Sequence, residues 1–488
     1  MNYKVYAPNV HLFAFCLKRS ANSPADSGGK ENDWLWQRGD DIISKTLNYK
    51  LNLIRLLAKN KQSDNPRLSL KATKPNDDDD AISVQGTVSL DSQPIGITGF
   101  VYPLRIYDSY GLWLNLRRPE KENNFWLNLL YPKRQNEQKT EAVDIQLLRQ
   151  LNPDNCLMLK EGDNFLGQTL LITAYLTPEY NPQDQQMLKK LADECLKAFF
   201  PENYTPPPFS GSSQLFGSPI FEYGLFSQIS NYRHILVWLF RDEEAGKNFN
   251  ICYQELLDLF FHRVKVVNAF QESRYAYQEA AKFYRDKITT KISETTNLNA
   301  QEKRLSATEL EDLKVQAKSL PQTALEYTKT LQDLETWQNI INIHGDNYNN
   351  KIALIKSILP NTDISFLETF GQKNSHFFQE QIRADLRYVN HGSGLLDKAI
   401  ASIRVRLEID QVEIDRELQN TIQVVGVGIG TAGVAATLIP YMIQQNNSPT
   451  PTPIPFAYSL IFSLGFGVMA AGFTMGCLDL WQHYSNKR

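Results

Sequence analysis

The sequence has no excess of charge of either sign. Its 488 residues include 51 Lys and Arg and 54 Asp and Glu, which gives a formal net charge of −3. Without a global basic field, attraction to a polyanion is weak, and we predict no nucleic-acid partner. Hydrophobic residues make up 42% and charged residues 22% of the chain, which is typical of a folded globular protein and excludes wholesale disorder.

Cysteine is scarce and scattered. The five cysteines are Cys16, Cys156, Cys195, Cys252 and Cys477. No two of them have the spacing of zinc ligands or of a C-x-x-C redox motif, so we predict no metal site and no cofactor. An odd number of cysteines without a disulfide framework favours a reducing compartment.

Catalytic motifs are also missing. The sequence contains no H-E-x-x-H, no G-x-S-x-G, no P-loop and no recognisable pair of catalytic carboxylates. Its seven histidines, among them His11, His234 and His262, are isolated, and such histidines usually lie at the surface or in a satisfied core. We predict that the protein is not an enzyme and assign no catalytic residue.

Charge disappears altogether over residues 418–478, which contain no Asp, Glu, Lys, Arg or His. Two apolar segments, residues 422–443 and 456–478, are each long enough as a helix to cross a hydrocarbon core of ~30 Å. The polar, proline-rich residues 444–455 between them predict a short outer loop. We expect a transmembrane helical hairpin; the alternative is a buried hairpin in a soluble core.

Basic residues predict the orientation of this hairpin. Arg404, Arg406 and Arg416 precede the first segment, Lys487 and Arg488 follow the second, and the loop has none. By the positive-inside rule both termini, including the tail 479–488, lie in the cytoplasm. We therefore expect an integral protein of the plasma or inner membrane, with the lipid bilayer as a partner.

Both apolar segments also contain small and polar residues. Residues 428–433 satisfy G-x-G-x-x-G, but the acidic residue that a dinucleotide site needs about 20 positions later is absent. The glycines instead form small-x-x-x-small pairs that favour close helix packing. These helix-packing residues are Gly426, Gly430, Gly472 and Gly476. Gln423, Thr431 and Thr437 are the candidates for lining a pore; their alternative role is hydrogen bonding between helices.

Long helices are expected before the first apolar segment. Apolar residues recur in steps of three and four over residues 382–414, which predicts a heptad seam and a homo-oligomer assembled through helices 382–443. Gly392 and Gly394 suggest a hinge there. A second seam spans residues 310–341, where Pro321 should kink or split the helix, and a third helix spans residues 253–288. We assign residues 220–421 to a helical coiled-coil stalk.

The first 200 residues predict an α+β domain, mainly antiparallel. Its expected helices are 34–58 and 183–200, and its expected strands are 83–90, 96–107, 112–117, 125–130 and 168–176. Residues 10–17 form an apolar run too short for a signal peptide and are expected as a strand. Residues 201–219 are rich in Pro, Gly and Ser and predict a linker, and residues 234–240 predict one more strand.

The order of an α+β domain, long helices, a heptad helix entering a first span, a short outer loop, a second span and a basic tail resembles the CorA-type two-span magnesium transporters. Where that family carries Gly-Met-Asn at the end of the first span, this chain has Pro440-Tyr441-Met442-Ile443-Gln444, and its loop has no acidic residue. The family's ion-binding residues therefore have no counterpart here.

This resemblance implies an oligomeric channel or transporter, or a ligand-gated membrane effector with a cytosolic sensing domain. The alternative is a membrane-anchored scaffold or interaction protein without transport activity. In either case the cytosolic domain is expected to bind an unknown ligand or protein.

Overall fold

The computed structural model describes residues 3–18, 33–58, 65–72, 80–123, 137–159, 162, 164–226, 232–299, 306–410 and 469. The chain divides into two compact units. Residues 1–271 and 338–380 form the first, called the sheet unit here, and residues 272–337 and 381–488 form the second, called the helical unit.

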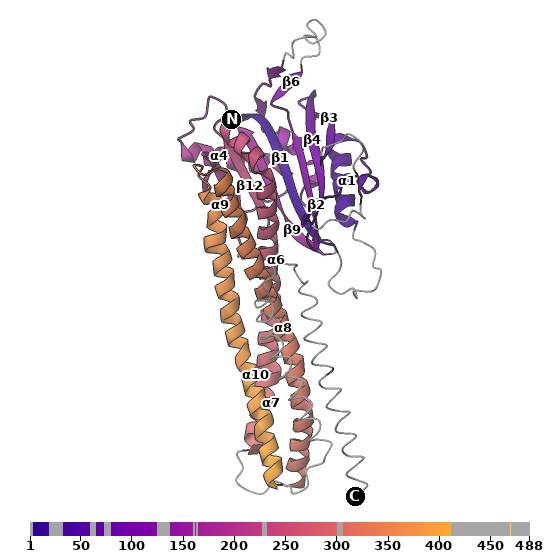
Figure 1. Cartoon of the computed structure of the whole chain (residues 1–488), viewed down its shortest axis with the longest axis vertical. Helices are drawn as coiled ribbons and strands as arrows, with labels where there is room; N and C mark the ends of the chain where they lie inside the picture. The colour runs from indigo at the N-terminus through magenta and orange to yellow at the C-terminus, as the bar shows by residue number, and fades with distance from the viewer. Residues whose placement is uncertain are drawn as a thin grey trace. The chain divides into compact units, whose positions relative to one another are not determined.

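A ten-stranded sheet is the framework of the sheet unit (Figure 1). Its strand order is β10-β11-β12-β9-β1-β5-β4-β2, with β3 paired to β4 and β8 paired to β1. All described pairs in this sheet are antiparallel except β12 with β9, which is parallel. The strands are β1 (Lys4–Leu17), β2 (Arg67–Ser69), β3 (Ile82–Leu90), β4 (Gln93–Ile106), β5 (Ser109–Arg117), β8 (Val143–Asp144), β9 (Phe165–Tyr175), β10 (Phe209–Leu215), β11 (Ser218–Tyr223) and β12 (His234–Phe240). A separate ribbon pairs β6 (Lys121–Asn123) with β7 (Glu137–Lys139).

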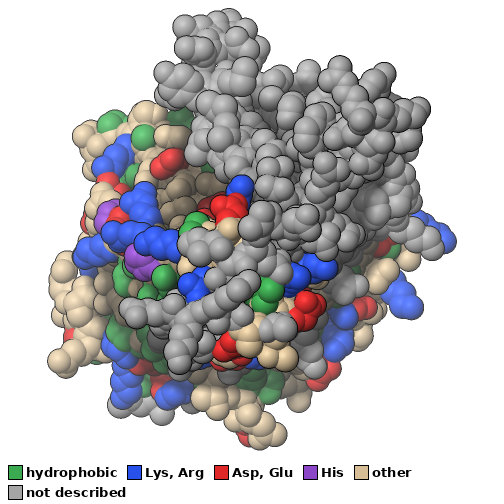
Figure 2. All heavy atoms as spheres, turned by 90° about the horizontal axis from the view of Figure 1, so that it is seen from below, with side chains coloured by type: hydrophobic (Ala, Val, Ile, Leu, Met, Phe, Trp, Pro, Cys, Tyr) green, Lys and Arg blue, Asp and Glu red, His purple; other side chains and the backbone are tan. Residues whose placement is uncertain are grey.

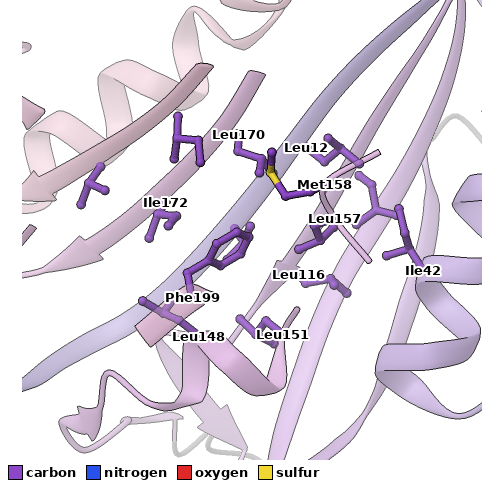
Figure 3. Packing of buried hydrophobic residues seen from close by; sticks show 14 of the residues in the cluster. Leu12, Ile42, Leu116, Leu148, Leu151, Leu157, Met158, Leu170, Ile172 and Phe199 are labelled. Carbon is purple, nitrogen blue, oxygen red and sulfur yellow. The ribbon is translucent and has the colours of Figure 1, made fainter. Parts of the chain in front are cut away.

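Both faces of the sheet are covered, because alternate residues of a strand point to opposite sides. Leu12 on β1 belongs to the main hydrophobic cluster, which also takes in α1 (Trp34–Leu47), α3 (Leu147–Gln150) and α4 (Gln185–Phe199). Figure 3 shows Leu12, Ile42 and Phe199 among the residues of this cluster. On the opposite face, Phe13 lies 4.8 Å from the ring of Phe260 in α6 (Tyr253–Phe283).

The predicted strands and helices of this domain are largely confirmed, with two differences. The first helix ends at Leu47 instead of residue 58, since Asn48 adopts a left-handed conformation, and a short 3-10 turn, η1 (Leu53–Leu56), follows. A second 3-10 turn is η2 (Pro153–Asn155). The segment 201–219, predicted as a linker, contains β10 and the start of β11, so the sheet continues past residue 200 to Phe240. Of the predicted strands, 125–130 lies outside the described residues.

The remaining helices are α5 (Glu243–Ile251), α7 (Thr289–Asn299), α8 (Ala307–Ile358), α9 (Ser365–Thr369) and α10 (His376–Asp410), with π-helical turns η4 (Tyr284–Ile288) and η5 (Phe370–Ser375). Helices α6, α8 and α10 begin or end in one unit and continue into the other without a break. Helix α8 runs through Pro321, which is buried. Of the two predicted outcomes at that residue, a split is therefore wrong, and a kink stays a prediction.

In the helical unit, α8 and α10 bury the predicted heptad seams within one chain. On α8 the buried members are Leu313, Ala317, Leu320, Ala324, Tyr327, Leu331 and Leu334. On α10 they are Ile382, Leu386, Val389, Leu396, Ile403 and Leu407. Gly392 and Ala399 are also buried on α10, and both glycines of the predicted hinge lie inside this helix.

The predicted transmembrane hairpin and membrane localisation are contradicted. Among the described residues, no helix combines the length and the apolar character needed to cross a bilayer. The long helices α6, α8 and α10 all carry charged residues along their length. The predicted spans 422–443 and 456–478, the loop 444–455 and the tail 479–488 lie outside the described residues, apart from Met469.

The surface presents both signs of charge. Figure 2 shows basic, acidic and hydrophobic side chains interspersed over the described part of one face.

Candidate functional site

Helix α6 carries an unusual concentration of buried polar side chains where it packs in the sheet unit. Asp258, His262, Arg263 and Lys265 are only 2–8% exposed. Moving an ionised side chain out of water costs several kcal/mol unless a partner compensates it. These four residues, with the side chains that surround them, are therefore the candidate site.

Arg263 sits at the centre of the first cluster. Its guanidinium forms an ion pair with Glu222 on β11 and donates a hydrogen bond to the Tyr232 hydroxyl at 3.2 Å. The same group lies 4.3 Å from the ring centroid of Phe370 and 5.4 Å from that of Phe226. A planar, weakly hydrated guanidinium is suited to such a mixture of carboxylate and aromatic contacts.

His234 on β12 extends this cluster into the sheet. Its Nδ1 lies 2.8 Å from the Thr169 hydroxyl on β9, and its Nε2 lies 3.3 Å from Glu222 Oε1. Burial acts to raise the pKa of Glu222, but the charge of Arg263 and the contact with His234 outweigh it and lower the pKa to about 2. Burial and the Arg263 charge lower the pKa of His234 to about 4. At neutral pH the cluster thus holds an ionised carboxylate, a guanidinium and a neutral imidazole.

Asp258 is the centre of the second cluster. Its two carboxylate oxygens contact Arg67 Nη1 on β2 at 3.2 Å and Lys351 Nζ on α8 at 2.7 Å. Arg67 also donates to the Gln254 carbonyl at 3.0 Å, one turn earlier on α6. One buried carboxylate therefore ties together a strand and two helices.

The third cluster is built on a pair of histidines. His262 Nδ1 on α6 lies 2.9 Å from His344 Nδ1 on α8, so a single proton serves both nitrogens. Burial lowers the pKa of His262 to about 4 and that of His344 to about 3. The third cluster also includes the ion pair between Lys265 on α6 and Asp108 in the β4–β5 turn. Lys265 Nζ donates to both carboxylate oxygens of Asp108, at 2.9 and 3.0 Å. Burial opposes it, but the Lys265 charge holds the pKa of Asp108 below its usual value.

The three clusters share one chemical pattern. The carboxylates of Asp258 (buried), Glu222 (half-buried) and Asp108 (exposed) are each in an ion pair with a basic side chain of another element. These ion pairs fix the position of α6 and α8 on the sheet. The electrostatic energy of each pair depends on the distance between the two elements that carry its charges. Among the described residues, no group of three or more His, Cys, Asp or Glu side chains could hold a metal ion.

The sequence-predicted site residues are not part of this site. The pore-lining candidates Gln423, Thr431 and Thr437 and the packing glycines Gly426, Gly430, Gly472 and Gly476 lie outside the described residues. Conversely, the sequence predicts that His234 and His262 are isolated, whereas each has a polar partner from a distant segment, Thr169 and His344 respectively. The available signal was local: the apolar run 256–267 of α6 is interrupted by four titratable residues.

Comparisons with protein-family models, curated proteins and solved structures find no match to this chain. The resemblance to CorA-type transporters therefore stays a prediction.

Proposed function

We propose that this chain is a non-catalytic sensor and scaffold. In this proposal the sheet unit responds to a bound partner, and the continuous helices α6, α8 and α10 carry the response into the helical unit. The observation that supports it is the set of ion pairs made by three buried side chains of α6, which join that helix to β2, β11 and the β4–β5 turn.

The charged residues at these positions favour a role in coupling the sheet to its helices over a role in stability alone. Replacing a buried ion pair with well-packed apolar residues is often neutral or stabilising, so a pair of this kind is weak evidence for stability alone. An ion pair in a low-dielectric interior does, however, distinguish sharply between two arrangements of its elements. The ion pair between Arg263 and Glu222 is the strongest candidate for distinguishing two arrangements in this way, because both side chains are mostly withdrawn from water.

The experiment compares hydrogen exchange in the full-length chain and in its Arg263→Met variant. Removing one partner of a buried pair costs about 3–5 kcal/mol, so the sheet unit loosens. If the proposal holds, amides of α6 and α10 within the helical unit, at residues 272–283 and 381–410, also exchange faster. The readout is deuterium uptake by mass spectrometry, resolved by peptide.

Leu191→Ala provides the matched control. Leu191 is fully buried on α4, away from α6, and its truncation costs about 2–5 kcal/mol through a cavity. This variant should loosen the sheet unit and raise exchange in the helical unit only through global unfolding, and therefore less than Arg263→Met does. If Arg263→Met raises exchange at residues 272–283 and 381–410 no more than Leu191→Ala does, the sensor function is wrong and the two units are merely tethered.

A further inference from the structure

Among the described strands, β3 lies at an edge of the ten-stranded sheet. It pairs with β4 on one side, and no described strand pairs with its other side. Its nine residues, ISVQGTVSL, contain no charged residue and no proline, and its pairing with β4 is continuous without a bulge. Proteins usually block an edge strand with charge, proline, a bulge or short length, and β3 has none of these features.

The β3–β4 hairpin determines which backbone groups face outward. A two-residue turn, Asp91-Ser92, joins the strands, and both of its residues have positive φ. Ser89 lies opposite Pro94, which has no N–H group, so this pair makes no ladder hydrogen bonds. By alternation, the N–H and C=O groups of Ser83, Gln85, Thr87 and Ser89 all point away from β4. The amide of Gln85 indeed donates to the Tyr49 hydroxyl instead of to β4.

The sequence of β3 is nearly the same in both directions around Gly86. In Ser-Val-Gln-Gly-Thr-Val-Ser, residues 83–89, Ser matches Ser, Val matches Val, and Gln85 matches Thr87. We infer that β3 pairs antiparallel with β3 of a second copy of this chain, about a two-fold axis at Gly86. This isologous interface stands independently of the proposed function.

The proposed register satisfies both faces of the extended sheet. Val84 and Val88 are buried on the α1 side. Val84 of one copy would lie opposite Val88 of the second copy, and Val88 opposite Val84. Gly86 faces the same side, where a Cβ would sit 3.1 Å from Leu47. The exposed side chains of Ser83, Gln85, Thr87 and Ser89 would form a polar ladder on the other face. The near-palindrome favours a second copy over an unrelated peptide, since a peptide would need no such symmetry.

Tyr49 competes with this pairing. Its half-buried hydroxyl occupies the Gln85 amide, which would donate to Thr87 of the second copy in the dimer. Formation of the dimer therefore displaces this contact. Tyr49→Phe removes the competitor and should tighten association.

The first test is the mass of the full-length chain, measured by sedimentation velocity over a range of concentrations. Thr87→Pro removes an outward N–H that the β3–β4 ladder does not use, and proline is tolerated at such edge positions. Thr87→Val keeps the N–H and serves as the matched control. We expect dimers for the parent chain and Thr87→Val, a monomer for Thr87→Pro, and a lower dissociation constant for Tyr49→Phe. If Thr87→Pro fails to fold, Thr87→Lys provides the same block through charge.

The second test reads the register directly. Gln85→Cys and Thr87→Cys are made on separate chains, mixed and oxidised. Paired residues at an outward position lie about 5.5 Å apart between Cα atoms, within disulfide range, whereas a diagonal pair lies at about 7–8 Å. We expect the mixture to cross-link efficiently and each variant alone to cross-link poorly. A monomeric parent chain, a Thr87→Pro dimer, or equal cross-linking in all three samples would overturn the inference.

Discussion

Four of the histidines are held neutral by their surroundings. Burial lowers the pKa of His234 and His262 to about 4 and that of His11 and His344 to about 3. The groups that face the pair of His262 and His344 come from three elements: Lys265 and Asp258 from α6, Lys351 from α8, and Asp108 from the β4–β5 turn. Protonating both rings would place two N–H donors 2.9 Å apart, which the packed helices cannot relieve without separating.

The first prediction follows from these pKa values. The unfolded chain takes up protons on these histidines below pH 6.5, whereas the native chain stays neutral until about pH 4, so stability falls as pH drops through this window. Lowering a pKa from 6.5 to about 4 corresponds to on the order of 3 kcal/mol for His262, which is almost fully buried. The measurement is the urea midpoint between pH 7 and pH 4.5.

Two substitutions make this prediction specific. His262→Gln removes one titrating ring and should reduce the loss of stability on acidification. His391→Gln removes a histidine that lies exposed on α10 and should leave the pH dependence as it was. A urea midpoint that stays constant from pH 7 to pH 4.5 would contradict the inference that burial lowers the pKa of these histidines in the native chain.

The partners of the candidate site could not have been predicted from sequence spacing. Lys265 and Asp108 are 157 positions apart, and His262 and His344 are 82 apart. Only the sheet register and the packing of α6 on it bring these pairs together. What the sequence does contain is the local anomaly of titratable residues within an apolar helical run, which identifies α6 but none of its partners.

At the scale of single elements, Gly392 is a packing position in α10. A Cβ at this residue would lie 2.7 Å from the Tyr284 ring and 2.9 Å from the Tyr327 ring and hydroxyl. Tyr327 is fully buried and its hydroxyl donates to the Val389 carbonyl, so it has no free space into which to move. The glycine therefore lets two tyrosines approach the helix, and it is not the hinge that its sequence suggested.

The second prediction compares two nearby glycines. Gly392→Ala gains about 1 kcal/mol of helix propensity but incurs about 1–3 kcal/mol of overpacking, so we expect a net loss of stability. Gly394→Ala meets nothing within 4 Å and should gain about 1 kcal/mol. Urea denaturation of both variants tests this. The packing argument fails if both alanines stabilise the chain equally.

Elements with strong local patterns were predicted well, and elements created by tertiary pairing were not. The apolar run 234–240 is strand β12 with the predicted bounds. Strand β10 was missed because its Gly and Ser residues have low strand propensity, and its extended form comes from pairing with β11. Helix α8 continues through Pro321 because packing of buried neighbours such as Leu320 and Ala324 outweighs the lost hydrogen bond.

At the scale of the whole molecule, the apolar residues of the heptad pattern pack within a single chain. Seam residues such as Ile382, Leu396 and Leu407 on α10 and Leu320 and Leu334 on α8 are buried in one copy. A heptad repeat specifies that helices associate, but it does not by itself specify whether they belong to one chain or to several. The assembly surface that we infer is accordingly the edge strand β3.

The third prediction concerns cooperativity between the two units. Helices α6, α8 and α10 cross the boundary unbroken, so an opening in one unit removes helical hydrogen bonds at the start of the other. We expect the described units to unfold in one calorimetric transition, with equal calorimetric and van't Hoff enthalpies. Glu272→Pro interrupts α6 at the boundary, because it removes one N–H donor and clashes with the carbonyl four residues earlier.

Glu272→Ala is the matched control, since it removes the same side chain and keeps the helix. In Glu272→Pro the calorimetric enthalpy should exceed the van't Hoff enthalpy as the transition separates into two, while Glu272→Ala should keep the single transition. Two separate transitions in the parent chain would instead mean that the helices do not couple the units. The sensor proposal would then lose its physical basis, whereas pairing through β3 would be unaffected.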